Sequence, residues 1–489
     1  MKFKIRSFKI GAGKPIVFIH KSDAKNLSIH VGNRVELSKN RKKIIAVVDL
    51  VGSYFEPGEV GVSREIIKKL NLKSGDEIEI SLTPSPQSTG LIQKKLSCTP
   101  YTKKELNTII KDIVNNALTE AEIAYFISGV YHCGMSDNEI INLTEAIYNN
   151  GEKIKWSHKN VADKHSIGGI PGNRTTPIIV SICAAAGVII PKTSSRAITS
   201  AAGTADSVES IARVDLSISE MKRVVRKTNA CLAWGGSLGL APADDKLIQV
   251  ERLINLDPEP QLIASILAKK LAAGSKFVLL DIPYGKNAKV SRKKAEHLKN
   301  KFKKLAKHFN LKIEVILTKG DEPIGNGIGP SLEIIDVIKV LKRENPPKDL
   351  ERKSLKMASI ILEMVGKAKK GEGMKKAQEI LNSGKAYKKF EEIILAQSGE
   401  IGYIRKAKYS HNVTSLRSGK ITAIDNKLVS HAARLSGCPT DKASGVYIYK
   451  HIGERIGKSE VIATIYSESK QKLREAVEFF IEFKPIKIG

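Results

Sequence analysis

The sequence predicts an α/β protein: a helical subdomain accompanies an α/β sheet domain, a β-rich barrel-like domain precedes them, and a C-terminal α+β domain follows. Three patterns in the 489 residues support this prediction. Apolar and polar residues alternate near the N-terminus, three helix-capping boxes come next, and helical segments then alternate with brief apolar strands. A chain of this length is expected to form two to four domains, each large enough to bury a core.

The first domain, residues 1–84, is expected to be β-rich. Its apolar residues alternate with polar ones, as in strands that bury one face; examples are Phe3, Ile5, Ile78, Ile80 and Leu82. Residues 44–51 are more continuously apolar and predict a buried strand, and Ser63 is placed to cap a short helix through Leu70. Residues 83–90 are rich in proline, serine and threonine, which is typical of a linker.

A helical domain is predicted for residues 95–158, joined by residues from about 240 to 272. Three capping boxes, each followed by apolar residues at helical spacing, indicate three helices. They are Thr102 with Glu105, Thr119 with Glu122, and Ser136 with Glu139.

The α/β domain is predicted for residues 159–335, with short apolar strands at 277–282 and 313–317 between helical stretches. The C-terminal α+β domain takes residues 336–489. Its first part is helical and lysine-rich, with a break at Pro346-Pro347, and its last ninety or so residues return to strands separated by glycines.

Two loops of the α/β domain carry the residues that phosphate binding requires. Residues 164–174 and 194–204 combine glycines, hydroxyls and cations, and the first loop leads into an apolar helix. Glycines let backbone amides approach an anion, hydroxyls donate hydrogen bonds, and a helix N-terminus adds positive potential. The spacing matches neither GxxxxGK[ST] nor GxGxxG. An ordinary pair of glycine-rich turns is the alternative interpretation.

The net charge and its distribution along the chain indicate which class of ligand the protein binds. A net charge of +30 suggests an attraction for anions, but the lysines are spread among acidic residues and aromatic residues are only 5% of the chain. Because no pattern of stacking aromatics accompanies the basic residues, we expect phosphorylated small molecules as partners and no nucleic acid.

Five scattered cysteines without a CxxC pair fit a reducing cytoplasm and argue against a structural zinc site. The sequence has no apolar run of about 18 residues and no signal-peptide pattern, so we expect a cytoplasmic protein that does not enter a membrane.

The first loop also carries a family resemblance. Residues Lys164–Gly169 read KHSIGG, which resembles the phosphate-holding KHSTGG segment of the thymidine and pyrimidine nucleoside phosphorylases, with Ile167 in place of threonine. The resemblance extends over residues 95–489, and the N-terminal domain and the 194–200 loop are most similar to the archaeal AMP phosphorylases of that family. It implies the nucleoside phosphorylase fold, in which the helical domain closes over the α/β domain.

This resemblance implies AMP and inorganic phosphate as substrates, with no cofactor and no metal. Lys164 and Ser166 match the phosphate contacts. The positions that match nucleotide-binding residues are Gly169, Ser195, Arg196, Ala197, Ile198, Thr199, Ser200, Thr204, Ser265 and Lys289. Of these, Arg196 or Lys289 is the candidate to grip the 5′-phosphate.

Two further positions match residues near the sugar or base in the pyrimidine enzymes. His165 is one, and a packing or loop hydrogen-bonding role is its alternative. Lys269 is the other, and near the end of a helix it would also complement the helix dipole.

The leaving base needs a proton, and Asp257 matches the proton donor of the AMP phosphorylases. Without the resemblance, an aspartate before Pro258 is ordinary turn chemistry. Glu251 stands where the pyrimidine enzymes have an arginine, and a carboxylate would repel the pyrimidine carbonyl oxygens. Arg252, one position later, is the alternative donor, and a solvated charge on a helix is the alternative role of Glu251. A purine nucleotide is therefore favoured over a pyrimidine nucleoside. The remaining alternative is a nucleic-acid-binding protein on the same scaffold.

The resemblance further implies a homodimer, or a larger homo-oligomer built through the N-terminal domain. β-Rich appendages with exposed edges readily form subunit contacts.

Overall fold

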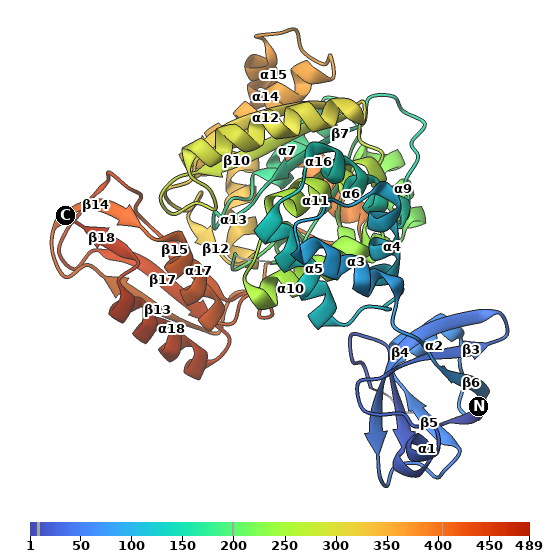
Figure 1. The fold of residues 1–489 in the computed structure, drawn as a ribbon. Helices are drawn as coiled ribbons and strands as arrows, with labels where there is room; N and C mark the ends of the chain where they lie inside the picture. The colour runs from blue at the N-terminus through green and yellow to red at the C-terminus, as the bar shows by residue number, and fades with distance from the viewer. Residues whose placement is uncertain (7–9, 198–199, 403) are drawn as a thin grey trace. The chain divides into compact units, whose positions relative to one another are not determined.

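The computed structural model describes residues 1–6, 10–197, 200–402 and 404–489. The chain divides into two compact units, and Figure 1 labels most of its helices and strands. Unit 1 comprises Met1–Gly151 and Ala241–Ala268, and unit 2 comprises Glu152–Leu240 and Lys269–Gly489.

The N-terminal part of unit 1 is a closed barrel with strand order β1-β5-β2-β4-β3-β6. Alternate residues of each strand face its core, as the period-2 pattern predicts. The strands are β1 (Lys2–Arg6), β2 (Ile16–His20), β3 (Arg34–Lys39), β4 (Lys42–Val51), β5 (Glu59–Val62) and β6 (Glu77–Leu82), with the helices α1 (Lys21–Asn26) and α2 (Arg64–Leu70). Ser63 precedes α2, but its hydroxyl bonds Lys14 and Ile16 instead of capping the helix.

Helices make up the rest of unit 1. They are α3 (Gln87–Leu96), α4 (Lys103–Val114), α5 (Glu120–Cys133), α6 (Asp137–Asn149), α10 (Pro242–Ile254) and most of α11 (Glu259–Ala272). All three predicted capping boxes are confirmed at the starts of α4, α5 and α6. The predicted linker is wrong from residue 87 onward, because α3 begins there. Ser88 is buried in α3 and donates to Asp112 (2.7 Å), so a residue typical of linkers anchors a helix.

Two of the five cysteines form a disulfide, which differs from the expectation that all five are reduced thiols. Cys98 and Cys133 form a disulfide that joins the segment after α3 to the end of α5, whereas Cys183, Cys231 and Cys438 are free and buried. Beside the disulfide, Lys95 and Glu139 form a buried ion pair (2.8 Å). The cysteines lie 35 positions apart, so only the folded chain shows that they are neighbours.

Unit 2 is built on parallel strands. β11 (Lys312–Lys319), β10 (Phe277–Tyr284) and β7 (Ala162–Ser166) form one sheet, and β8 (Ile190–Ser194) pairs with β9 (Ala230–Trp234). A parallel bridge between Val161 and Ile189 connects the two sets just before β7 and β8. The predicted strands at 277–282 and 313–317 are confirmed as parts of β10 and β11.

Helices surround these strands and enclose the largest core of unit 2. They are α7 (Thr175–Ala185), α8 (Thr204–Glu209), α9 (Ile218–Thr228), α12 (Arg292–His308), α13 (Pro330–Lys342), α14 (Lys348–Met364), α15 (Gly373–Asn382), α16 (Lys385–Ala396) and the 3-10 turn η1 (Gly235–Leu238). Nearly every residue of α7 is buried, which is why its sequence is apolar on all sides.

The C-terminal part of unit 2 contains two antiparallel sheets and two helices. One sheet has the order β12-β15-β17-β13 and the other β16-β14-β18. The elements are β12 (Gly327–Ile328), β13 (Tyr409–Thr414), β14 (Gly419–Ile424), α17 (Asn426–Leu435), β15 (Gly445–Ile448), β16 (Arg455–Ile456), β17 (Val461–Ser467), α18 (Lys470–Phe483) and β18 (Ile486–Ile488).

Candidate active site

The first predicted phosphate segment begins on a strand and not in a loop. Lys164 and Ser166 lie on β7, two positions apart, so their side chains point to the same face of the sheet. Lys164 is 2% exposed. Its ammonium donates to the hydroxyls of Thr175 (3.0 Å) and Thr176 (3.4 Å) in the first turn of α7. The segment therefore places an ammonium group and two hydroxyls at the N-terminus of a buried helix, as an anion site requires.

A buried carboxylate on the adjacent strand contacts Ser166 and a further buried lysine. Asp281 of β10 pairs in register with Ser166 of β7. Its oxygens accept from the Ser166 hydroxyl (3.2 Å) and the Thr318 hydroxyl (2.7 Å) and contact the ammonium of Lys353 (3.0 Å). Asp281 is fully buried. Burial opposes ionisation, but the ammonium groups of Lys353 and Lys164 outweigh it and keep the pKa of Asp281 below its ordinary value.

A second buried carboxylate lies on the N-terminal side of Lys164. Asp163 contacts the ammonium groups of Lys192 on β8 (3.3 Å) and Lys270 near the end of α11 (2.6 Å). Burial lowers the pKa of Lys270 to about 8, although Asp163 acts in the opposite direction.

Cations outnumber carboxylates in this network. Four ammonium groups, each at most 10% exposed, share two carboxylates that are completely buried. The four are Lys164, Lys192, Lys270 and Lys353. Unbalanced buried charge is costly, so the network is suited to an additional anion.

This environment also shifts the pKa of Lys164 and His165. Burial lowers the pKa of Lys164 to about 7, with the Asp281 carboxylate opposing the shift and nearby cations adding to it. Burial, together with Lys270 and Lys192, holds the pKa of His165 well below its ordinary value. At neutral pH the imidazole is therefore uncharged, while the charge of Lys164 responds to its surroundings.

Glycines shape the chain after β7. Gly169 has a φ of +89°, and a Cβ built there would approach the backbone nitrogen of Lys289 to 3.2 Å. Gly172 has a φ of +67°, and a Cβ there would lie 2.4 Å from the carbonyl oxygen of Ile324. Glycine is required at both positions because of the positive φ and the close approach. The loop thus brings two predicted nucleotide-binding residues, Gly169 and Lys289, side by side.

Arg174 connects the two predicted loops. Its guanidinium pairs with buried Glu333 and donates to the Thr204 hydroxyl (2.7 Å) and the Ala202 carbonyl (2.8 Å). Thr204, at the start of α8, is thereby held next to the first loop.

The second loop is held by carboxylates of the protein. Arg196 donates to both oxygens of Glu209 (2.6 and 2.7 Å), lies 3.4 Å from Asp206 and from Asp215, and stacks on the Trp234 ring. These carboxylates raise the pKa of Arg196 further, and the Arg196 guanidinium lowers the pKa of Glu209 to about 2. The guanidinium is therefore already neutralised.

The backbone of the second loop is anchored as well. Asp206 accepts from the amides of Ala197 (2.6 Å) and Gly203 (2.8 Å), and the Ser200 hydroxyl donates to the Ala202 carbonyl. Ser195 is exposed. The buried Ser194 hydroxyl, at the end of β8, has no hydrogen-bond partner among the described residues. The predicted residues Ile198 and Thr199 lie outside the described residues.

Two predicted site residues belong to unit 1. Asp257 is exposed in the connection between α10 and α11, and Ser265 is half-buried on α11. Glu251 is half-buried on α10. Lys269 follows on α11, at the start of the second segment of unit 2, next to Lys270.

The glycine-rich stretch 325–329 holds a carboxylate of its own chain. Asp336 accepts from the amides of Asn326 and Gly327 (2.7 Å each), and Asp349 accepts from the amide of Gly325 (2.9 Å). This anion-binding turn is thus filled by the protein.

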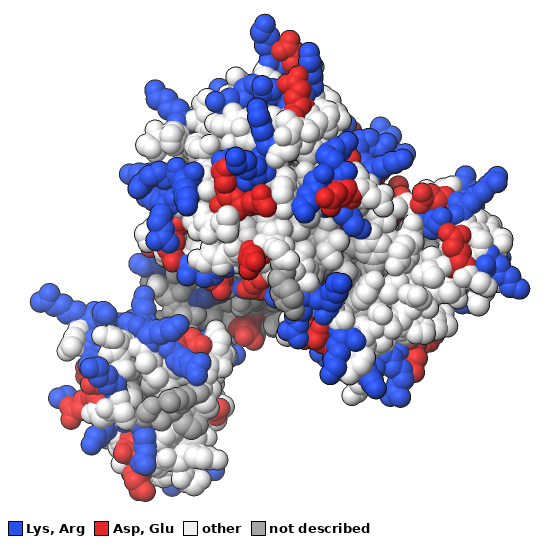
Figure 2. All heavy atoms as spheres, turned by 180° about the vertical axis from the view of Figure 1, so that it is seen from behind, with Lys and Arg blue, Asp and Glu red and all other residues white. Residues whose placement is uncertain are grey.

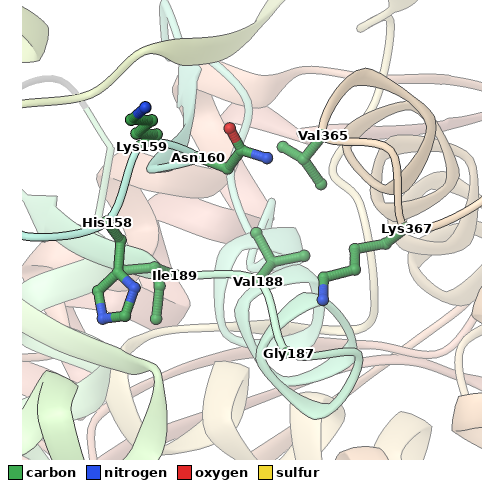
Figure 3. A pocket seen from close by; sticks show the side chains of 8 residues that line it. All are labelled: His158, Lys159, Asn160, Gly187, Val188, Ile189, Val365 and Lys367. Carbon is green, nitrogen blue, oxygen red and sulfur yellow. The ribbon is translucent and has the colours of Figure 1, made fainter.

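A separate cavity of about 380 Å³ lies where the chain enters β7 and β8 (Figure 3). It is lined by His158, Lys159, Asn160, Gly187, Val188, Ile189, Val365 and Lys367. A Cβ built on Gly187, just after α7, would lie 3.4 Å from the ammonium of Lys367, where this cation complements the C-terminal end of the helix. The cavity is at the opposite ends of the strands from Ser166 and Ser194, and we assign no ligand to it.

Sequence reasoning missed the charged residues that support the site. Asp163, Lys192, Asp281 and Lys353 were not predicted as site residues. An ionisable residue inside an otherwise apolar strand, as Asp281 is in β10, is the signal that could have revealed this carboxylate.

Three family models match the chain. They are described as "Glycosyl transferase family, helical bundle domain" over residues 89–151, "Glycosyl transferase family, a/b domain" over 158–387 and "Pyrimidine nucleoside phosphorylase C-terminal domain" over 420–486. The chain is 41% identical to an AMP phosphorylase of Methanococcus aeolicus, covering 96% of this chain and 94% of that protein. It is 40% identical to an AMP phosphorylase of Pyrococcus furiosus, covering 100% and 98%. The chain belongs to the AMP phosphorylase family.

The predicted family is thus confirmed, together with its helical bundle, α/β domain and C-terminal domain. A solved structure of anthranilate phosphoribosyltransferase from Thermus thermophilus shares this fold, with a TM-score of 0.53 at 16% identity over 63% of this chain and 99% of that one. Among the residues that the structure describes, no helix is both long and apolar enough to cross a membrane.

Proposed function

We propose that this member of the AMP phosphorylase family catalyses the reversible phosphorolysis of AMP, releasing adenine and ribose 1,5-bisphosphate, with CMP and UMP as further candidate substrates. The excess of buried ammonium groups at β7 carries this proposal, because it suits a phosphate that must be held without water. Relatives named AMP phosphorylase, similar over nearly the whole chain, support the choice of nucleotide.

Lys164 and Ser166 are the proposed contacts of the attacking phosphate. Their side chains lie on one face of β7, and the hydroxyls of Thr175 and Thr176 are within hydrogen-bonding reach of the Lys164 ammonium. A phosphate dianion beside Lys164 would favour its charged form. Phosphate binding and protonation of Lys164 are therefore coupled in this proposal.

For the 5′-phosphate of the nucleotide we propose Lys289, because its exposed side chain lies beside Gly169, which is also proposed for nucleotide binding. Arg196 is the second candidate; its guanidinium pairs with Glu209, and a 5′-phosphate would have to replace that carboxylate. The second loop then contributes backbone and hydroxyl groups to nucleotide binding. The residues proposed for nucleotide binding are Gly169, Ser195–Ser200, Thr204, Ser265 and Lys289.

Asp257 is the proposed proton donor to the leaving base. Cleavage of the C1′–N bond passes through an oxocarbenium-like state, and protonating the base makes it a better leaving group. Water must be excluded from the reacting sugar, so that phosphate and not water attacks it. His165 is proposed to act near the sugar or base as a neutral imidazole, and Lys269 near the base.

We also propose a cytoplasmic homo-oligomer, a dimer or a larger assembly through the barrel, that does not bind nucleic acid. On the face shown in Figure 2, Lys and Arg side chains are spread over the surface with Asp and Glu among them. A dispersed pattern of this kind favours small anionic substrates over a long polyanion.

The test is a phosphorolysis assay that compares AMP, CMP, UMP, adenosine and thymidine at equal concentrations. We expect a 5′-mononucleotide, AMP first, to react faster than either nucleoside. If thymidine outpaces every nucleotide, the protein is a pyrimidine nucleoside phosphorylase, the alternative that the match over residues 420–486 supports. If none of the five reacts and nucleic acid binds with a steep salt dependence, the third alternative holds.

A further inference from the structure

We propose that Asp281 is a positioning residue that holds the Ser166 side chain in place and balances the charge of Lys164 for phosphate, and that Lys353 opposes it as a competing cation. The inference rests on the proposed phosphate site and adds residues that have no assigned role in it. Neither Asp281 nor Lys353 needs to touch the substrate.

Strand pairing puts Asp281 in the required place. In the register between β7 and β10, Asp281 is the partner of Ser166, and Leu279 is the partner of Lys164. One carboxylate oxygen of Asp281 accepts from the Ser166 hydroxyl (3.2 Å), and the other accepts from Thr318 on β11 (2.7 Å). The Ser166 hydroxyl thus donates its one proton to Asp281, so Ser166 can accept from a protonated phosphate oxygen as it stands and must turn away from Asp281 to donate to one.

Lys353 of α14 uses the same carboxylate. Its ammonium lies 3.0 Å from the Asp281 oxygen that accepts from Ser166, and 3.2 Å from the Thr318 hydroxyl. Its side chain is only 10% exposed. The negative charge of Asp281 therefore acts on two ammonium groups: that of Lys353, which it contacts, and that of Lys164 on the neighbouring strand.

The charged groups around Lys164 come from four elements. Asp281 of β10 favours the ammonium form, whereas Lys353 of α14, Lys192 of β8 and Arg174 before α7 disfavour it. Removing Asp281 or Lys353 therefore has opposite consequences for Lys164. Loss of the carboxylate makes Lys164 harder to protonate, and loss of the competing cation makes it easier to protonate.

The experiment measures sulfate binding by calorimetry as a function of pH, with full-length protein and no nucleotide. Sulfate imitates phosphate but keeps its charge through the neutral range, so a pH midpoint in its affinity reports protein groups. For the wild type we expect a midpoint near the Lys164 pKa of about 7. Asp281→Asn should lower the midpoint by about one pH unit, and Lys353→Met should raise it by a similar amount.

A matched control is Glu139→Gln, which removes another buried carboxylate, one paired with Lys95 in unit 1. It should reduce thermal stability and leave the sulfate midpoint in place. Midpoints that stay fixed, or that move in the same direction in Asp281→Asn and Lys353→Met, would overturn the proposal. If Asp281→Asn does not fold, Lys353→Met decides alone: an upward shift supports the proposal and no shift refutes it.

Sulfate binding also separates this inference from the proposed function. Wild-type protein that binds sulfate with the expected midpoint but leaves AMP intact would contradict the proposed activity and retain the role of Asp281. Wild-type protein that does not bind sulfate at all would refute the phosphate site and, with it, this inference.

Discussion

The charge of Lys164 gives the sharpest prediction for the anion site. Because the side chain is 2% exposed and its pKa is about 7, it is about half protonated at pH 7 and about 1% protonated at pH 9. An anion binds the protonated form more tightly and raises the pKa in the complex. The affinity is therefore greatest below the pKa of the free site and falls as the pH rises through it.

The size of the effect follows from these populations. Between pH 7 and pH 9 the protonated fraction falls about 50-fold, which is the upper limit for the loss of sulfate affinity and is reached if the neutral form of Lys164 does not bind sulfate. Lys164→Met should remove the part of the pH dependence that is centred near pH 7 and leave any contribution of Lys270, whose pKa is about 8. It should also weaken binding at pH 6 by about 1.5–3 kcal/mol, the usual contribution of a charged hydrogen bond.

The assay is calorimetric titration with sulfate from pH 6 to pH 9, with Lys95→Met as the matched control. Lys95 is also a buried lysine, but it lies in unit 1, where it pairs with Glu139, so its variant should keep the wild-type affinity and pH profile. A wild-type affinity that is flat across this range, or an undiminished affinity in Lys164→Met, would refute the reasoning.

Four other predictions concern the remaining parts of the chain. Replacing Cys98 and Cys133 by serine removes a crosslink across 35 positions and should destabilise unit 1 by up to about 4 kcal/mol. Calorimetric melting should show a lower Tm for this variant, and reductant should lower the Tm of the wild type in the same way. Equal wild-type Tm values with and without reductant would contradict this prediction. Asp257→Asn should slow AMP turnover by about 10²-fold or more with little change in KM, and an unimpaired kcat would assign the acid elsewhere. Lys289→Met should raise KM for AMP about tenfold or more and leave adenosine kinetics unchanged; an equal effect on both would argue against a 5′-phosphate contact. Deleting residues 1–84 should reduce the oligomer mass measured by light scattering, and an unchanged mass would remove the assembly role of the barrel.

Local sequence signals predicted much of the fold. The capping boxes at Thr102, Thr119 and Ser136 mark the starts of helices through short-range hydrogen bonds, and the apolar run at 277–282 marks a strand buried on both faces. Both signals act over a few residues and need no knowledge of tertiary contacts. The prediction failed at α3, because the role of Ser88 depends on Asp112, a residue from another helix.

The candidate site was predictable only in part, for a related reason. The phosphate segment at Lys164 is local and could be recognised from its residues. The neutralisation of Arg196 depends on Glu209, Asp206 and Asp215, and the filling of the glycine turn at 325–329 depends on Asp336. Glycines and cations indicate where an anion is bound, but only the folded chain shows whether that anion belongs to the protein.

The most direct test of the central claim, separate sites for two phosphoryl groups, is a crystal structure with AMP and sulfate bound. We predict sulfate at Lys164 and Ser166, and the phosphate of AMP at a second position beside Gly169 and Lys289. A structure in which one anion pocket serves both ligands would contradict the account and leave a nucleoside enzyme in its place.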